Sequence, residues 1–146
     1  MRKKLYLFIL PFFLFSCPGL NDWRYKLPND YEMWHINSSN ITVGLAGKDN
    51  SSLSIYDGGI LIGIPPHIID FGHDEKYVCA KIITKESQGN EYFYYILDTQ
   101  NRYIYEFSNE NDFNEKMEEL DIGIKIKNLK ESIQTGEIKV EYPKLY

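Results

Sequence analysis

YVCAKIITKESQGNEYFYYILDTQNRYIYEF, residues 77–107, contains three segments rich in β-branched and aromatic residues, separated by two polar segments. Residues of these kinds pack well on the pleated, half-buried surface of a sheet. The polar segments at 87–90 and 99–101 have the composition of turns. The stretch therefore predicts three antiparallel strands, at 77–84, 92–98 and 102–107, connected as a meander.

The residues after the meander, SNENDFNEKMEEL at 108–120, predict an amphipathic helix at 109–120. Either residue of the Ser-Asn pair at 108–109 can cap the first turn, and the acidic residues inside that turn favour the positive end of the helix dipole. Phe113, Met117 and Leu120 stand at positions i, i+4 and i+7 and form one apolar stripe. We expect this stripe to pack on the meander.

The part of the chain before the meander also carries strand signals, with turns at Pro28-Asn29-Asp30 and Asp57-Gly58-Gly59 that predict two hairpins. The predicted strands are 23–27, 31–36, 41–45, 53–56, 60–64 and 68–72. After the helix the pattern is ambiguous: 124–129 can be strand or loop, and EIKVEY at 137–142 can be a last strand. The sequence thus predicts the α+β class, with a mostly antiparallel sheet of about six to eight strands and one packed helix.

The N-terminus has the pattern of a lipoprotein signal peptide at 1–16, followed by Cys17. Three basic residues precede an apolar run at 5–15, which is shorter than the about 20 residues that a membrane-spanning helix needs. Leu14-Phe15-Ser16-Cys17 resembles the bacterial lipobox, in which cleavage precedes a cysteine that carries a diacylglycerol thioether. We expect a lipidated tether at 17–22 and a single domain at 23–146.

An ordinary secretory signal with Cys17 left as a thiol is the alternative for this segment. A disulfide between Cys17 and Cys79 would tie the N-terminus to a predicted strand, and small secreted folds usually carry more cysteines than two. Lipidation leaves Cys79 unpaired, which suits a buried and unreactive residue. The expected location is the bacterial cell envelope, with the chain anchored to a membrane by its lipid. If the host is Gram-negative, we expect the outer membrane, because Pro18, not aspartate, follows Cys17.

The charge of the chain limits its partners. The formal net charge is −5, and removal of 1–16 takes away three basic residues and no acid, so the mature chain has a charge of −8. An acidic chain without a basic patch is poorly suited to nucleic acid, and we expect no such partner. The expected partners are the membrane, through the lipid on Cys17, and another protein of the envelope.

Two groups of residues are candidates for binding. HIIDFGHDEK, residues 67–76, supplies metal-ligand types within a short stretch, namely His67, Asp70, His73 and Asp74. The alternative for this stretch is a polar turn in which Asp74 bonds backbone N–H groups. The second group is a tyrosine-rich sheet face, Tyr92, Tyr94, Tyr103 and Tyr105, whose alternative is an ordinary packed face of a sheet.

No catalytic motif is present in the sequence, and we predict no catalytic residue and no cofactor. The chain has no GxSxG motif, and its GGILIG segment lacks the lysine and helix start of a phosphate-binding loop. Cys79 lies in an apolar segment without a charged activator nearby in sequence. These absences favour a non-enzymatic role, without deciding the question.

Several stretches together resemble the DUF3997 family of small, uncharacterised bacterial lipoproteins. They are PGLNDWRYKLPNDYEMWHINSSN after the lipobox cysteine, IIDFGHDEKYVCAKI, YFYYILD and DFNEKMEELDI. The resemblance covers about residues 17–125. It implies an envelope lipoprotein, and it carries over no catalytic residue because none is assigned in the family.

The leading hypothesis is therefore a lipid-anchored envelope protein that binds another envelope component. One alternative is a metal- or small-ligand-binding domain, with hydrolysis as one form of it, centred on residues 67–75. A further alternative is an inhibitor or immunity-type lipoprotein, whose acidic charge would suit a basic partner.

Overall fold

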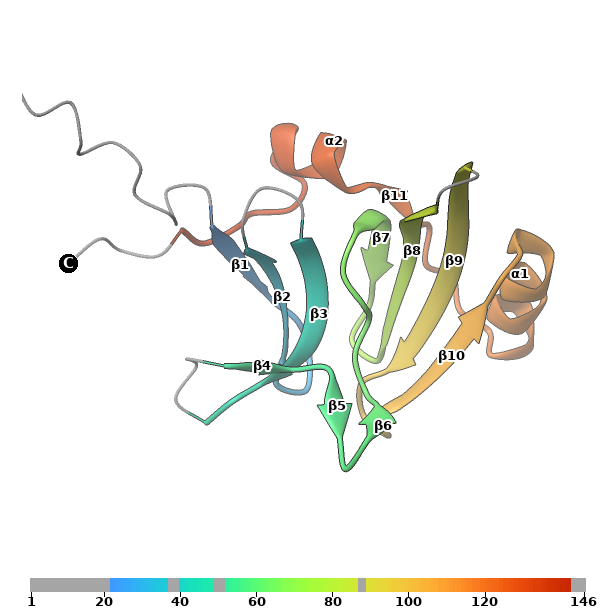
Figure 1. The fold of residues 1–146 in the computed structure, drawn as a ribbon, viewed down its shortest axis with the longest axis horizontal. Helices are drawn as coiled ribbons and strands as arrows, with labels where there is room; N and C mark the ends of the chain where they lie inside the picture. Colours follow the sequence, from blue (N-terminus) through green and yellow to red (C-terminus); the bar gives the residue numbers. More distant parts are fainter. Residues whose placement is uncertain (1–21, 37–39, 49–51, 87–88, 143–146) are drawn as a thin grey trace, which may run out of the picture.

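Two antiparallel sheets pack face to face, and a helix covers the outer face of the second sheet (Figure 1). This computed structural model describes residues 22–36, 40–48, 52–86 and 89–142. The α+β class predicted from the sequence is confirmed. None of the helices in the described ranges is long and apolar enough to cross a membrane.

The second sheet is built around the predicted meander, which the structure confirms. Its order is β10-β9-β8-β7-β11, and all neighbours are antiparallel. The strands are β7 Ile68–His73, β8 Tyr77–Glu86, β9 Gly89–Asp98, β10 Tyr103–Phe107 and β11 Lys127–Asn128. β8 and β9 pair along their whole length, so the longest hairpin of the described chain forms the centre of this sheet.

The first sheet has the order β1-β2-β3-β4. Its strands are β1 Trp23–Lys26, β2 Tyr31–Ile36, β3 Asn40–Ala46 and β4 Leu53–Ser54. Asn29 and Asp30 both have positive φ, 58° and 65°, and Tyr31 N–H donates to Pro28 C=O. This is a type I′ turn, whose twist matches that of two antiparallel strands, and it confirms the first predicted hairpin.

The second predicted hairpin forms, but its strands are shorter than expected. β5 Tyr56–Asp57 pairs with β6 Ile60–Leu61, whereas Leu53 and Ser54 pair with β3 instead. After the hairpin the chain returns along β3 and passes very close to it at Gly63. Only a residue without a side chain fits there, because an added Cβ would stand 2.4 Å from the carbonyl oxygen of Val43. The segment thus divides between two sheets, which local alternation could not indicate.

The main core lies between the two sheets. Its fully buried members include Met33 and Val43 from the first sheet and Val78 and Leu97 from the second. A second cluster lies on the other face of the second sheet, under α1 Glu110–Glu119. Asn109 caps this helix by accepting a bond from the N–H of Asp112, and Phe113 and Met117 are buried as the stripe predicted.

The C-terminal part contains a helix that the sequence did not predict. α2 Leu129–Gln134 follows β11, and Asn128 caps it by accepting from the N–H of Glu131. The expected last strand at 137–142 is reduced to one bridge between Arg24 and Glu141. The described residues contain eleven strands rather than six to eight, because four of them have only two residues.

Candidate functional site

The residues proposed as metal ligands lie along β7 and the turn that follows it. Asp70 and His73 are three positions apart on one strand, so their side chains point to opposite faces of the sheet. Asp74 accepts from the backbone N–H groups of Lys76 and Tyr77, at 2.8 and 2.7 Å, as the alternative interpretation predicts. No group of three or more His, Cys, Asp or Glu side chains that could hold a metal ion occurs in the described part of the chain.

His67 and Asp70 have separate surroundings. His67 is exposed with a φ of 76°, and its carbonyl accepts from the N–H of Ile83. Asp70 stands opposite Lys81 in the pairing of β7 with β8. A β-bulge between Ile68 and Asp70 interrupts the pairing with β8 between these two positions.

His73 belongs to a different arrangement, with Tyr25 of the first sheet. Its Nδ1 lies 3.2 Å from the carbonyl oxygen of Asp74, which can only accept, so the proton of a neutral imidazole is on Nδ1. Its Nε2 then accepts from the hydroxyl of Tyr25, at 2.9 Å. Burial raises the pKa of the Tyr25 hydroxyl. The pair borders a cavity of about 380 Å³ and links the two sheets through a polar contact.

The four tyrosines proposed as a binding face do share one side of the second sheet, as alternation predicts. However, α1 covers the middle of this face. Tyr94 is buried, with its ring 5.3 Å from that of Phe113 and its hydroxyl donating to Glu110. Tyr92 and Tyr103 are exposed, but they stand near opposite ends of β9, about 20 Å apart along the strand.

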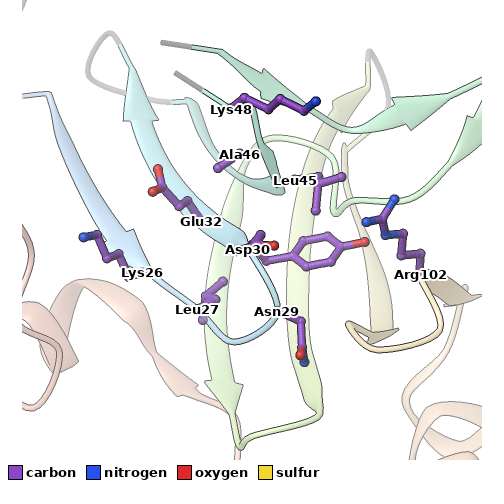
Figure 2. A pocket seen from close by; sticks show the side chains of 11 residues that line it. Lys26, Leu27, Asn29, Asp30, Glu32, Leu45, Ala46, Lys48 and Arg102 are labelled. Carbon is purple, nitrogen blue, oxygen red and sulfur yellow. The ribbon is translucent and has the colours of Figure 1, made fainter. Parts of the chain in front are cut away.

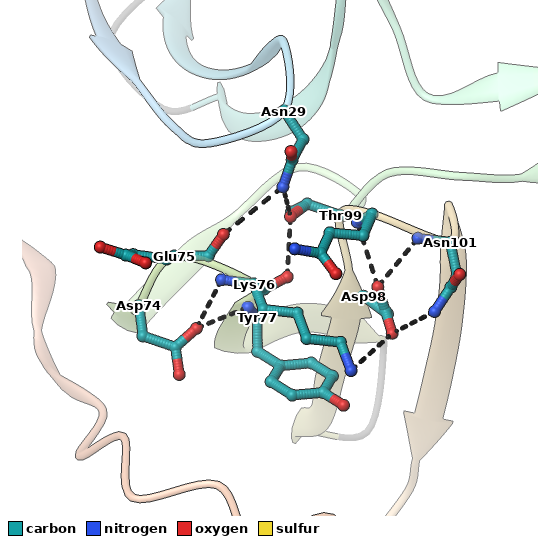
Figure 3. Close-up of polar contacts among 9 residues, drawn as sticks. Asn29, Asp74, Glu75, Lys76, Tyr77, Asp98, Thr99 and Asn101 are labelled. Carbon is teal, nitrogen blue, oxygen red and sulfur yellow. Dashed lines mark hydrogen bonds and ion pairs between the residues drawn. The ribbon is translucent and has the colours of Figure 1, made fainter.

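A polar network joins three turns at one end of the domain (Figure 3). Thr99 is its centre: the hydroxyl donates to Lys76 C=O at 2.7 Å and accepts from the side-chain amide of Asn29 at 2.8 Å. The same carbonyl of Lys76 also accepts from Thr99 N–H. These contacts fasten the β1–β2 turn of the first sheet to the β7–β8 and β9–β10 turns of the second.

Asp98 shapes the β9–β10 turn within this network. One carboxylate oxygen accepts from the N–H groups of Gln100 and Asn101, and the other accepts from the Asn101 amide and lies 3.6 Å from the ammonium of Lys76. Burial by itself would raise the pKa of Asp98. The hydrogen bonds from Asn101 and Gln100 and the charge of Lys76 outweigh burial, so the pKa lies below the ordinary value.

A charged pocket of about 790 Å³ opens beside this network (Figure 2). Its apolar lining comes from Leu27, Leu45 and Ala46, and its polar lining comes from both sheets. The polar side chains are Lys26, Asn29, Asp30, Tyr31, Glu32, Lys48 and Arg102. We call this cavity the turn pocket, because the β1–β2 and β9–β10 turns form two of its walls.

The network positions the two turns that build the turn pocket. Asn29 lines the pocket and also bonds Thr99, so the β1–β2 turn that carries Asp30 is fixed against the second sheet. Arg102 directly follows Asn101, which Asp98 holds. Arg102 has a φ of 54°, a left-handed conformation that is unusual for a residue other than glycine, asparagine or aspartate. The pocket is therefore built on a rigid polar base.

Sequence reasoning missed the turn pocket. The available signal is that Lys26 and Arg102 stand near the ends of predicted strands, and that Lys48 stands three residues after the predicted strand 41–45. That signal is weak because charged residues are common at strand ends. Residues 26, 48 and 102 meet only when the two sheets pack, and no local pattern encodes that packing.

Only one of the two cysteines lies in the part of the chain that the structure describes. Cys17 lies outside the described residues. Cys79 is fully buried on β8, and its thiol donates to the Met117 sulfur at 3.4 Å. Burial and the charge of Asp74 raise the pKa of the Cys79 thiol to about 12. The thiolate is therefore scarce at neutral pH, and Cys79 has no access to an oxidant or a partner thiol.

A family model described as "Protein of unknown function (DUF3997)" matches residues 28–132. The matched region runs from the β1–β2 turn into α2, and it contains the polar network and most of the turn pocket. The comparison with curated proteins finds no match. The comparison with solved structures finds none either.

Proposed function

This chain belongs to the DUF3997 family of proteins of unknown function, and we propose that it is a lipid-anchored, non-enzymatic binding protein of the bacterial cell envelope. In this proposal Cys17 carries the lipid and the folded domain presents a binding pocket to the envelope. The absence of a catalytic motif in the sequence supports a binding role over a catalytic one.

The state of Cys79 is the observation that carries the proposal. A disulfide between Cys17 and Cys79 would require the Cys79 sulfur to leave its place between β8 and α1, where it contacts Met117. Exposing that site would disrupt the packing of the helix on the sheet. An intramolecular disulfide is thus disfavoured, and a cysteine that directly follows a lipobox is then best explained as the lipidation site.

The direction of β1 supports a particular orientation on the membrane. Trp23 stands six positions after Cys17, a span of at most about 20 Å. β1 starts at Trp23 and ends at Lys26, which lines the turn pocket. The β1–β2 turn and the β5–β6 hairpin lie at the lower end of the domain in Figure 1, while β1 starts at the upper end. A lipid near Trp23 would leave the turn pocket facing away from the membrane.

Mass spectrometry of the protein expressed as the full chain in a bacterial host tests the anchor. We expect a mature N-terminus at Cys17 that carries a diacylglyceryl group, and fractionation with the membrane. The matched variant Cys17→Ala should lose the lipid mass and leave the membrane fraction, while Cys79→Ala should keep both. An unmodified residue at position 17 in the mature protein would refute the proposal.

A further inference from the structure

We infer that the turn pocket binds a small oxyanion ligand, a phosphate monoester or a carboxylate, between Lys48 and Arg102. This inference names the ligand class for the binding role proposed above and rests on it. The argument comes from the charges of the pocket, from the placement of Arg102 and from the carboxylates that share the pocket.

The two cations come from different sheets and face a common space. Lys48 follows β3 of the first sheet, and Arg102 lies in the β9–β10 turn of the second. Figure 2 shows the Lys48 side chain above Leu45 and the Arg102 side chain to the right of Leu45. A ligand that contacts both would bridge the two sheets. The planar guanidinium suits an oxyanion because it can donate two parallel N–H bonds.

Three cations outside the pocket show what a paired cation of this chain looks like. Lys76, Lys116 and Lys127 each pair with a carboxylate of this chain. By contrast, the side chains of Lys48 and Arg102 make no ion pair and no ring contact with any residue that the structure describes. Asp30 also lines this pocket, yet neither cation is within ion-pair distance of it. No carboxylate of the described residues therefore neutralises either cation. Arg102 does act on Tyr31 of the same pocket: burial raises the pKa of the Tyr31 hydroxyl, and the charge of Arg102 offsets part of that rise.

The backbone at Arg102 has a conformation that costs conformational free energy. A left-handed φ at a residue with a Cβ costs about 1 kcal/mol or more, and such conformations persist where the surroundings fix them. Here Asp98 fixes the turn through Gln100 and Asn101. The turn thus fixes the backbone that carries Arg102 at the pocket before a ligand arrives, so the backbone needs no reordering on binding.

The carboxylates of the pocket narrow the ligand class. Glu32 is buried, and its carboxylate accepts from the indole N–H of Trp34 at 2.5 Å. This bond keeps the carboxylate within the wall of the pocket. Asp30 adds a second carboxylate near the ligand space. Two negative groups disfavour ligands of high charge, such as polyphosphates. They favour a ligand with one anionic group and a hydroxyl or amide donor that Asp30 can accept from.

Calorimetric titration of the full chain, purified from membranes in detergent, tests the inference with two probes. The probes are glycerol 3-phosphate and N-acetylalanine, each at constant ionic strength, so that the phosphate and carboxylate sources are distinguished. We expect saturable binding of at least one probe with a dissociation constant of about 1 mM. Arg102→Gln and Lys48→Gln should each weaken it by about tenfold or more.

Lys130→Gln is the matched control, because Lys130 is exposed on α2 and lies outside the turn pocket. It should bind as the unmodified chain does. No saturable binding of either probe would overturn the inference, and so would binding that Arg102→Gln leaves unchanged. If the processed full chain carries no lipid at Cys17 but still binds a probe, the anchor is refuted and the pocket inference stands. If it carries the lipid and binds neither probe, the reverse holds, so the two failures are distinguishable.

Discussion

The polar network and the turn pocket lie on the same turns, but they differ in whether their polar groups have partners within the chain. In the network, Asp98 and Thr99 have several partners each and are almost fully buried. In the pocket, Lys48 and Arg102 have no ion pair with the described residues. A set of satisfied polar groups stabilises a fold, whereas open charges around a cavity are available to a ligand.

This contrast gives a way to separate structure from function. Substitutions in the network should lower the free energy of unfolding. Substitutions in the pocket should leave that free energy nearly unchanged and should weaken ligand binding. The following predictions run from the largest expected effect to the smallest.

Asp98→Ala should have the largest effect on stability. The change removes the acceptor for two backbone N–H groups and the Asn101 amide, and it removes the partner of Lys76. We expect a loss of about 2–3 kcal/mol in the free energy of unfolding, measured by denaturant titration. Asp57→Ala, at an exposed position of the β5–β6 hairpin, should change it by less than about 0.5 kcal/mol. Equal effects of the two substitutions would contradict the structural role of Asp98.

Thr99→Val should lower stability by about 1–2 kcal/mol, because a side chain of the same shape loses one donated and one accepted bond. The loss also frees the β1–β2 turn from the second sheet, so ligand binding at the turn pocket should weaken as well. Thr84→Val, whose hydroxyl makes a single bond of 3.5 Å, is the control and should be nearly neutral. Proton exchange of the Asn29 side-chain amide, followed by NMR, should become faster only in Thr99→Val.

Acidification should remove the contribution of Asp98 gradually. The folded-state pKa of Asp98 lies below its ordinary value of 3.8. The stabilisation is therefore complete above that ordinary value and is lost as the pH falls from about 4 through the lower folded-state pKa. The difference in unfolding free energy between the unmodified chain and Asp98→Ala should be constant from pH 7 to 5 and should shrink toward pH 3. A difference that does not change with pH would show that the charge of Asp98 is irrelevant.

Arg102→Gly should have the smallest effect on stability, and in the opposite direction. Glycine adopts a positive φ without strain, but it also increases the freedom of the unfolded chain. We expect a change between zero and a gain of about 1 kcal/mol, together with loss of oxyanion binding. A large loss of stability in this variant would place Arg102 in the structural network and not in the ligand site.

Much of the fold could be predicted because its signals are local. The three strands of the meander, the Asn109 cap and the buried pair Phe113 and Met117 follow from composition and periodicity within a few residues. The turn at Asn29 and Asp30 is a local signal as well, since these residue types tolerate positive φ. Segments whose partners lie far along the chain were predicted less well. The split of 53–64 between two sheets depends on the approach of Gly63 to Val43, and α2 is too short to show a clear period.

The candidate site shows the same division more strongly. The sequence alone determined the strand alternation that puts Tyr92 and Tyr94 on one face, and it determined the turn in which Asp74 accepts two backbone bonds. Only the tertiary structure decided that α1 covers Tyr94 and that Lys48 and Arg102 line one pocket. The physical reason is the separation along the chain between the residues that interact. Hydrogen bonding in a turn and alternation along a strand are set by neighbours, whereas a pocket between two sheets exists only after both sheets have buried their apolar faces against each other.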